Sequence, residues 1–373
     1  MDRIGDKIRC NPSVKLQKGN LYSFIDMEKI KIGTKYITGF DYASYEGQSC
    51  SKFCSGDTIM ARITPCLENG KIAQYKSDSE KAFGSTEFFV FRGIPNITDS
   101  NYVYYLMSTK YIRDLAINSM TGASGRQRAD VKFIKKIKWK FPDLPTQQRI
   151  ADILSTYDDL IENNNKRIAL LEKAAQELYK EWFVRFRFPG HETTKFVNGL
   201  PEGWEVKKVK SLVNRLPFGT LYKSENTLPE GKVIVIDQSQ DAYAGFHNDA
   251  PSHIASIENP IALFGDHSCK YQLMITPFSL SENVVPYTAK GDMLTVYLYY
   301  SLCGLVETSE YKRHWKELMS KKVLVAPHDL QKNFSIFLKD KLLLIESLKE
   351  QNFNLAKQRD LLLPRLMSGK LEV

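Results

Sequence analysis

The fold is decided by residues 146–182, which read TQQRIADILSTYDDLIENNNKRIALLEKAAQELYKEW. Apolar positions in this stretch recur at alternating steps of four and three residues, which is the spacing of a coiled-coil seam. The seam positions are Ile150, Leu154, Tyr157, Ile161, Asn164, Ile168, Leu171, Ala175, Leu178 and Trp182. A stripe this narrow, held for about five heptads, predicts a long helix that packs against a partner helix.

A second stretch, residues 331–367, carries the same pattern at a constant offset of 184 residues. Its seam positions are Phe334, Leu338, Lys341, Ile345, Leu348, Asn352, Leu355, Arg359, Leu362 and Leu366. We expect the two helices to pair with each other as an antiparallel rod of about 55 Å, at about 1.5 Å per residue. Because each helix follows a globular segment, the pattern indicates that one unit occurs twice in the chain.

The predicted fold class is α+β, with two similar mixed α/β domains separated by a pair of long antiparallel coiled-coil helices and related by a rough two-fold. The predicted boundaries are 1–145 for the first domain, 146–182 for the first helix, 183–330 for a linker and the second domain, 331–367 for the second helix and 368–373 for a tail. Thr146 and Asp329 are the expected N-caps of the two helices.

Short apolar runs broken by Gly, Asn and Ser predict strands in both domains. In the first domain these are 56–63 and 87–91, followed by a helix over 102–116 and a strand in which Ile137, Trp139 and Phe141 alternate with lysines. The second domain repeats the plan, with expected strands at 233–236, 260–264, 272–276 and 323–325 and a helix over 294–303. A repeat of this length indicates duplication of a whole domain rather than a solenoid array.

Composition places the chain among ordinary globular proteins, with 43% hydrophobic and 12% aromatic residues in 373. No apolar run is long enough for a membrane span and the first residues lack a signal-peptide core, so we expect a cytoplasmic protein without membrane contact. The six cysteines show no paired spacing, which argues against a disulfide framework or a zinc site. They are expected to be free thiols.

The formal net charge of +9 is unevenly distributed along the chain. Residues 1–145 hold 23 Lys or Arg against 15 Asp or Glu, whereas residues 183–330 hold 16 of each. An anionic partner such as nucleic acid fits the basic first domain, although solubility alone explains a modest excess equally well.

Motifs for catalysis or cofactor binding are not found. There is no phosphate-binding GxxxxGK[ST] loop, no GxGxxG after a strand and no Asn-Pro-Pro-Tyr-type motif of an amino-methyltransferase. The six histidines lie in separate segments with no i, i+4 pair, so a metal site is not expected. The sequence therefore predicts a non-catalytic chain with no catalytic or metal-binding residues and no cofactor of its own.

Basic residues in loops between strands are the candidate nucleic-acid contacts. Within residues 126–140, seven positive charges meet one acid, a cluster suited to phosphates, and Arg or Gln at its loop end suits base edges. For any single lysine, a solvated surface position is an equally good interpretation. The candidate DNA-binding residues are Arg62, Lys71, Arg126, Gln127, Arg128, Lys132, Lys223, His267, Lys270 and Arg313.

Polar residues interrupt both helix seams. Asn164 in the first helix and Lys341, Asn352 and Arg359 in the second either pair with each other or fix the register of the coiled coil. The expected helix-pairing residues are Ile150, Leu154, Ile161, Asn164, Ile168, Leu171, Leu178, Leu338, Ile345, Leu348, Asn352, Leu355 and Leu362. If each domain met a major groove, the DNA site would have two halves about one helical turn, roughly 34 Å, apart.

Several segments resemble the specificity (S) subunits of type I restriction-modification systems. The matching segments are Leu144–Leu154, Asp158–Asn164, Leu171–Glu172, Glu181–Val184, Leu200–Glu205, Leu362–Leu363 and Ser368–Leu371. The architecture covers the whole chain, and the specific motifs cover mainly the central region. One departure is that no Pro-x-Gly-Trp sequence precedes Arg3, whereas Pro201 to Trp204 opens the second domain.

The resemblance implies a non-catalytic subunit that reads double-stranded DNA. Each domain would be a target-recognition domain for one half of an interrupted, bipartite site, and the paired helices would hold two methyltransferase (M) subunits. Those subunits would flip and methylate adenine with S-adenosylmethionine, and restriction (R) subunits would add ATP-driven cleavage. S-adenosylmethionine, ATP and Mg are therefore expected only in partner subunits.

Two other classes of protein remain open at this stage. A single-chain restriction enzyme or methyltransferase of a related system would need catalytic motifs that are not found. A coiled-coil scaffold would bind only protein, and its basic first domain would be incidental. Binding to duplex DNA that weakens with added salt would favour the specificity subunit over the scaffold.

Overall fold

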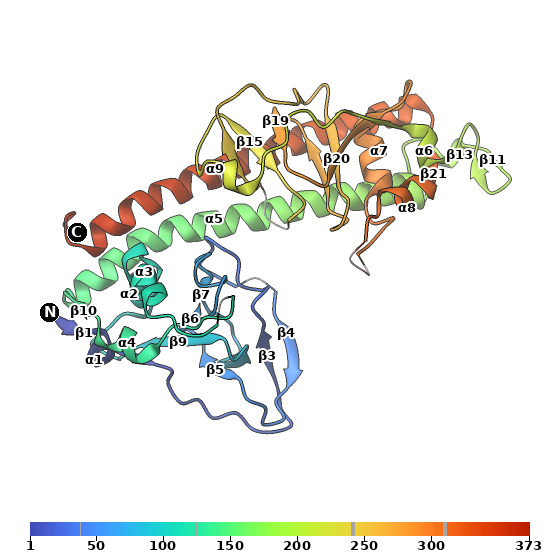
Figure 1. Ribbon diagram of the computed structural model, residues 1–373. Coiled ribbons are helices and arrows are strands. Elements are labelled where there is room, and N and C mark those ends of the chain that lie inside the picture. The colour runs from blue at the N-terminus through green and yellow to red at the C-terminus, as the bar shows by residue number, and fades with distance from the viewer. Residues whose placement is uncertain (38, 124, 240–242, 309–311) are drawn as a thin grey trace. The chain divides into compact units, whose positions relative to one another are not determined.

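The computed structural model describes residues 1–37, 39–123, 125–239, 243–308 and 312–373 (Figure 1). The chain divides into two compact units, Met1–Lys166 with Lys349–Val373, and Arg167–Leu348. Each unit contains small β-sheets with short helices and one part of each of two long helices, α5 (Leu144–Tyr179) and α9 (His328–Met367). The α+β class and the internal duplication are confirmed by this architecture.

The described strands of the first unit form two sheets with the orders β2-β9-β6-β7 and β4-β3-β8-β5, and a short pair β1-β10. Strands β3 and β8 run parallel, whereas the other neighbours run antiparallel. Their bounds are β1 Asp2–Arg3, β2 Ile8–Cys10, β3 Leu21–Ile25, β4 Asp41–Ser44, β5 Ser51–Cys54, β6 Thr58–Ala61, β7 Ile72–Gln74, β8 Lys81–Gly84, β9 Phe88–Gly93 and β10 Lys138–Trp139.

Short helices follow the strands of the first unit, namely α1 Ile4–Lys7, α2 Ser100–Ser108, α3 Lys110–Asn118 and α4 Val131–Lys136. Side chains cap α2, α3 and α4 at their N-termini, since Asp99, Thr109 and Asp130 accept hydrogen bonds from backbone N–H groups of the first turn. The expected strand over 136–141 is only partly present, because Lys136 still belongs to α4 and pairing with β1 is limited to Lys138–Trp139.

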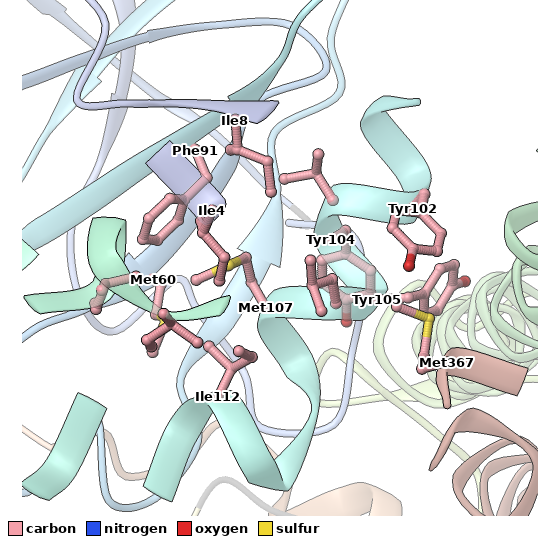
Figure 2. Close-up of a cluster of buried hydrophobic side chains, with 14 of the residues drawn as sticks. Ile4, Ile8, Met60, Phe91, Tyr102, Tyr104, Tyr105, Met107, Ile112 and Met367 are labelled. Atoms are coloured by element: carbon pink, nitrogen blue, oxygen red, sulfur yellow. The ribbon is translucent and has the colours of Figure 1, made fainter. Parts of the chain in front are cut away.

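The main core of the first unit is built from strands, α2 and the end of α9. Figure 2 shows Ile4, Phe91 and Tyr102 in this cluster together with Met367, which comes from the last turn of α9. A second cluster around Phe53 and other buried residues lies under the β4-β3-β8-β5 sheet. The first unit therefore closes its core with residues from both ends of the chain.

The second unit repeats the strand order of the first, except that its described strands include no counterpart of β5. Its described strands form sheets with the orders β14-β20-β17-β18 and β16-β15-β19, with pairs β13-β21 and β11-β12. Strands β15 and β19 run parallel, as β3 and β8 do in the first unit. The bounds are β11 Phe196–Val197, β12 Leu200–Pro201, β13 Glu205–Lys208, β14 Val213–Arg215, β15 Val233–Ile236, β16 Gly245–His247, β17 Ile261–Gly265, β18 Tyr271–Met274, β19 Phe278–Leu280, β20 Val284–Ala289 and β21 Lys322–Val325, with helices α6 Val209–Leu212, α7 Thr295–Leu302 and α8 Trp315–Ser320.

Both long helices start earlier than expected. Asp143 caps α5 by accepting a hydrogen bond from the backbone N–H of Thr146 at 3.0 Å, so Thr146 lies in the first turn and is not the N-cap. Pro145 is accommodated there because the first turn of a helix needs no N–H donor. Asp329 likewise lies inside α9 instead of capping it. At its other end α5 continues into a π-helical turn, Lys180–Val184.

Within the first unit, the early part of α5 packs antiparallel against the late part of α9. Ile150 and Leu154 are buried, whereas Ile161, Leu355 and Leu362 are half-buried. The seam polars find partners on the opposite helix. Asn164 donates to Gln351 at 3.5 Å, Asn352 donates to Asn165 at 2.8 Å, and Arg359 pairs with Asp158.

Within the second unit, the late part of α5 packs against the early part of α9, and aromatic rings replace the polar pairs. Tyr179, Phe183 and Phe334 have ring centroids 5.1–6.0 Å apart and join Tyr297 and Trp204 in one cluster. Lys341 stays on its own helix, where its ammonium lies 3.8 Å from the ring centre of Phe337. Of the remaining seam residues, Leu338, Ile345 and Leu348 are buried and Ile168, Leu171 and Leu178 are half-buried.

Candidate nucleic-acid interface

Two of the expected DNA contacts of the first unit, Arg62 and Arg128, meet at one carboxylate, and Gln127 adjoins Arg128 in the chain. Arg62 follows β6, and Gln127 and Arg128 lie in the segment before α4. This segment is fixed across the end of β6 by backbone hydrogen bonds, from Ala129 to Arg62 at 2.8 Å and from Thr64 to Gln127 at 3.0 Å. The structure thus brings together residues that are about 65 positions apart in the sequence.

The carboxylate belongs to Glu87, in the turn before β9. Arg128 donates through Nε and Nη2 to its two oxygens at 2.7–3.1 Å, and Arg62 donates through Nε to Oε2 at 3.1 Å. These hydrogen bonds, above all those from Arg128, lower the pKa of Glu87 below its ordinary value, so the group is ionised at neutral pH. Two arginines against one acid leave this site with a positive charge.

The other candidate DNA-binding residues of the first unit differ in their exposure and contacts. Arg126 is exposed in the same segment, whereas Lys71 uses its ammonium to donate to the carbonyl of Met27 at 2.9 Å. Lys132 is exposed on α4, beside a shallow hollow of about 350 Å³. The hollow is lined by Arg3, Gly5, Asp6, Lys132, Lys135 and Lys136.

In the second unit, the turn between β17 and β18 holds His267 and Lys270 and contacts the segment before α8. His267 Nδ1 lies 3.1 Å from the carbonyl of Lys312, and Arg313 Nε lies 3.9 Å from a carboxylate oxygen of Asp266. Lys223 is exposed in the loop between β14 and β15, and so it does not belong to this turn.

The candidates of the two units occupy topologically equivalent places. In each unit the turn after the inner strand, β6 or β17, contacts the segment that leads into the helix α4 or α8. Sequence reasoning found the basic members of these loops but missed Glu87 and Asp266, the acids that face them. No local pattern marks an acid whose arginine partner is 41 or 47 residues away.

Among the described residues, no group of three or more His, Cys, Asp or Glu is arranged to hold a metal ion. In the same part of the chain, none of the helices has the length and apolar character needed to cross a bilayer.

Several known proteins are similar to this chain. Residues 14–173 match the model of the type I restriction modification DNA specificity domain. The type I restriction enzyme MjaIX specificity subunit of Methanocaldococcus jannaschii is 26% identical over 312 residues, which cover 74% of this chain and 69% of the relative. Residues 14–173 thus match a DNA specificity domain, and the chain is similar over most of its length to a specificity subunit of a type I restriction enzyme.

Two further comparisons give similar results. The MjaVIII specificity subunit of the same organism is 34% identical over 143 residues, covering 38% of this chain and 33% of the relative. The crystal structure of the type I restriction-modification S subunit from M. genitalium superposes with a TM-score of 0.50 at 17% identity, covering 98% of this chain and 95% of the other. That superposition supports the fold.

Proposed function

We propose that this chain is a non-catalytic specificity subunit that reads a bipartite, interrupted site in double-stranded DNA, one half through each unit. The observation that supports the proposal is the repeated topology, which puts a basic turn and a helix-entry segment at the same place in both units. Such paired loops suit two half-sites of different sequence, because the strand framework is shared while the loop residues differ.

We further propose that two methyltransferase (M) subunits dock on the helix pair, and that restriction (R) subunits complete the assembly. Exposed apolar residues on the helices support this. Ile153 and Leu160 on α5 in the first unit recur, at the offset of 184, as Phe337 and Leu344 on α9 in the second unit, and all four are exposed. Two matching apolar patches fit two copies of one partner. S-adenosylmethionine, ATP and Mg would be bound by these partners, and the assembly would work in the cytoplasm.

A binding experiment tests DNA recognition. The full chain is titrated with duplex DNA over a range of salt concentrations, and we expect affinity to fall steeply because phosphate contacts release counterions. The triple variant Arg126→Glu, Arg128→Glu, Lys132→Glu should lose DNA binding while it still assembles with methyltransferase subunits. Equal affinity at low and high salt, or an unaltered affinity of the triple variant, contradicts the proposal.

A capture experiment tests docking. Leu160→Arg and Phe337→Arg place a charge in the two apolar patches, and each should reduce the methyltransferase recovered with the specificity subunit to about half if one copy is lost. The control is Asn163→Arg, which adds the same charge at an exposed polar position of α5. Full recovery of both copies with either patch variant would exclude these residues from the docking surface.

A further inference from the structure

Arg128 is held in one orientation. Backbone hydrogen bonds with Thr121, at 2.9 and 3.1 Å, fix the base of its side chain, and Glu87 fixes the guanidinium at the other end. Glu87 is 19% exposed and Arg128 is 44% exposed, so the carboxylate lies beneath and the arginine above it. A guanidinium has five N–H donors, and the contact with Glu87 uses the edge formed by Nε and Nη2.

The opposite edge of the Arg128 guanidinium is therefore presented for a ligand. Within the described residues, Nη1 makes no hydrogen bond, and together with the second hydrogen of Nη2 it forms a two-donor fork. That fork matches two acceptors side by side, such as O6 and N7 of guanine in the major groove or two oxygens of a phosphate. The fixed plane of the Arg128 guanidinium favours the guanine edge over the phosphate, because a phosphate can be bound without a fixed plane.

Arg126 provides the contrast within the same segment. Its side chain is exposed, and no carboxylate lies within ion-pair distance of it in the part of the chain that the structure describes. Such an unsupported arginine can follow a phosphate but has no fixed plane with which to select a base.

The second unit contains a similar pair at the equivalent place. Asp266 is buried after β17, and its carboxylate accepts from the backbone of Trp315 at 2.8 Å. Arg313 approaches the same carboxylate at 3.9 Å, with 74% of its side chain exposed. An acid beneath an arginine at the helix-entry segment thus occurs in both units, although the acids come from different turns.

We propose that Glu87 is a specificity-determining residue of the first unit, which acts by holding Arg128 so that its outer edge reads a guanine in the half-site. Arg128 makes the base contact, Glu87 is the positioning residue, and Arg126 binds phosphate. This inference rests on the proposed function, because it names the base contact at the site proposed above.

The test compares base preferences at each position of the DNA site. Full-length chains are incubated with a pool of randomised duplexes, bound DNA is sequenced, and affinities for the selected duplex and its single-base changes are measured. We expect Arg128→Lys, which keeps the charge but not the fork, to lose preference for guanine at one position by about 5- to 150-fold. Glu87→Gln should relax the same position while affinity for unrelated duplex rises, since one negative charge is removed.

The matched variant is Arg126→Lys or Arg126→Ala at the neighbouring position. Arg126→Ala should weaken binding to all duplexes alike and reduce the slope of log affinity against log salt by about 0.9, the loss of one phosphate contact. Thermal unfolding of each variant checks whether the fold is retained. If Glu87→Gln does not fold stably, the base preferences of Arg128→Lys alone test the role of Arg128.

The outcomes distinguish a failure of the Arg128 base contact from a failure of DNA recognition itself. Unchanged preferences in Arg128→Lys, in a wild-type chain that is itself selective, overturn the role of Arg128 and leave DNA recognition intact. A lost guanine preference in Arg126→Ala assigns the base contact to the wrong arginine and also overturns the inference. A wild-type chain that binds duplex without any preference overturns the proposed function and this inference with it.

Discussion

Arg359 lies in the seam of the helix pair and faces Asp158, with side-chain exposures of 9% and 3%. Asp158 also accepts a hydrogen bond from Tyr105 at 2.5 Å, and Arg359 donates to the carbonyl of Gly33 at 3.1 Å. Burying two charges is costly unless every donor and acceptor is used, and here the surrounding groups supply those partners. The pair therefore ties a loop of the first domain to both long helices.

We expect Asp158→Asn to lower the free energy of unfolding by about 3–5 kcal/mol, because the buried Arg359 then keeps only the largely exposed Asp360 as a counter-charge. Urea denaturation followed by circular dichroism measures the loss. The control is Glu162→Gln, which removes the i, i+4 salt-bridge partner of the exposed Lys166 and should cost less than about 1 kcal/mol. Equal losses for the two variants would show that the buried pair does not contribute in this way.

Lys35 makes the stability of the same contact between loop and helix depend on pH. Its ammonium is buried, donating to Ser155 at 2.8 Å and Asn101 at 3.1 Å, and burial lowers the pKa of Lys35 from 10.5 to about 8. Between these values the unfolded chain binds more protons than the folded one, so the contribution of Lys35 to stability increases as pH rises. The free-energy cost of burying the protonated Lys35 ammonium is largest below pH 8.

The measurement is the stability of the wild type relative to Lys35→Met at several pH values. We expect this difference to shift in favour of the wild type between about pH 8 and 9.5, with other ionisable groups cancelling between the two proteins. A difference that stays constant over this range would mean that the pKa of Lys35 is the same in both states.

Sequence reasoning reached some of these residues and not others. The heptad pattern places Arg359 in the seam and predicts that it needs a partner, but Asp158 lies one position beyond the seam residue Tyr157. Lys35 and Glu87 could not be found, because their partners lie far along the chain and no periodic pattern connects a loop residue to a distant side chain.

The long helices are the elements best predicted from sequence. Their seams run over the expected stretches because alternating steps of four and three apolar residues are typical of paired helices and of few other structures. Their ends were misplaced by a few residues, since Asp143 competes with Thr146 as the cap and a single-sequence pattern does not decide between them. The short strands were less predictable, because pairing such as that of β1 with β10 depends on segments about 136 residues apart.

Two phenylalanines of α9 distinguish the inner and outer faces of the helix. Phe334 is fully buried in the aromatic cluster, whereas Phe337 is 51% exposed. We expect Phe334→Ala to lower stability by about 3–5 kcal/mol through the cavity it leaves. Phe337→Ala should cost less than about 1 kcal/mol in the same unfolding measurement, while recovery of methyltransferase subunits falls. A large stability loss in Phe337→Ala would place that ring in the core instead.

At the scale of the whole molecule, the positive charge is concentrated in the first 145 residues. Lys132, Lys135 and Lys136 are exposed on α4 beside the hollow that Arg3 also lines, and within the described residues these lysines form no ion pair. Clustered positive charges of this kind bind the phosphate backbone of DNA independently of its base sequence.

Reversing these three lysines to Glu should weaken binding to specific and unrelated duplexes alike and make it less dependent on salt. The matched control reverses Lys18, Lys31 and Lys173, which are exposed elsewhere and change the net charge by the same amount. Filter binding at several salt concentrations compares the two triple variants. Equal weakening would show that total charge matters and that its position on α4 does not.

The duplication of the molecule was predictable from the constant offset of the two seams, and the repeated sheet order confirms it. The composition of the compact units was not. Residues 349–373 join the first unit rather than the second, because the antiparallel helix pair returns the chain to the first domain. A contiguous boundary such as 1–145 cannot describe a unit made of two separate segments. The sequence pattern shows which residues follow one another, but not which distant residues pack together after folding.

That return of the chain has a consequence during synthesis. Leu366 and Met367, which complete the core of the first unit, leave the ribosome only after all of residues 167–348 have been made. At about 5–20 residues per second, the nascent first unit keeps an open apolar face for roughly 10 to 40 s. Translation speed and chaperone supply thus become determinants of how much protein reaches its finished form.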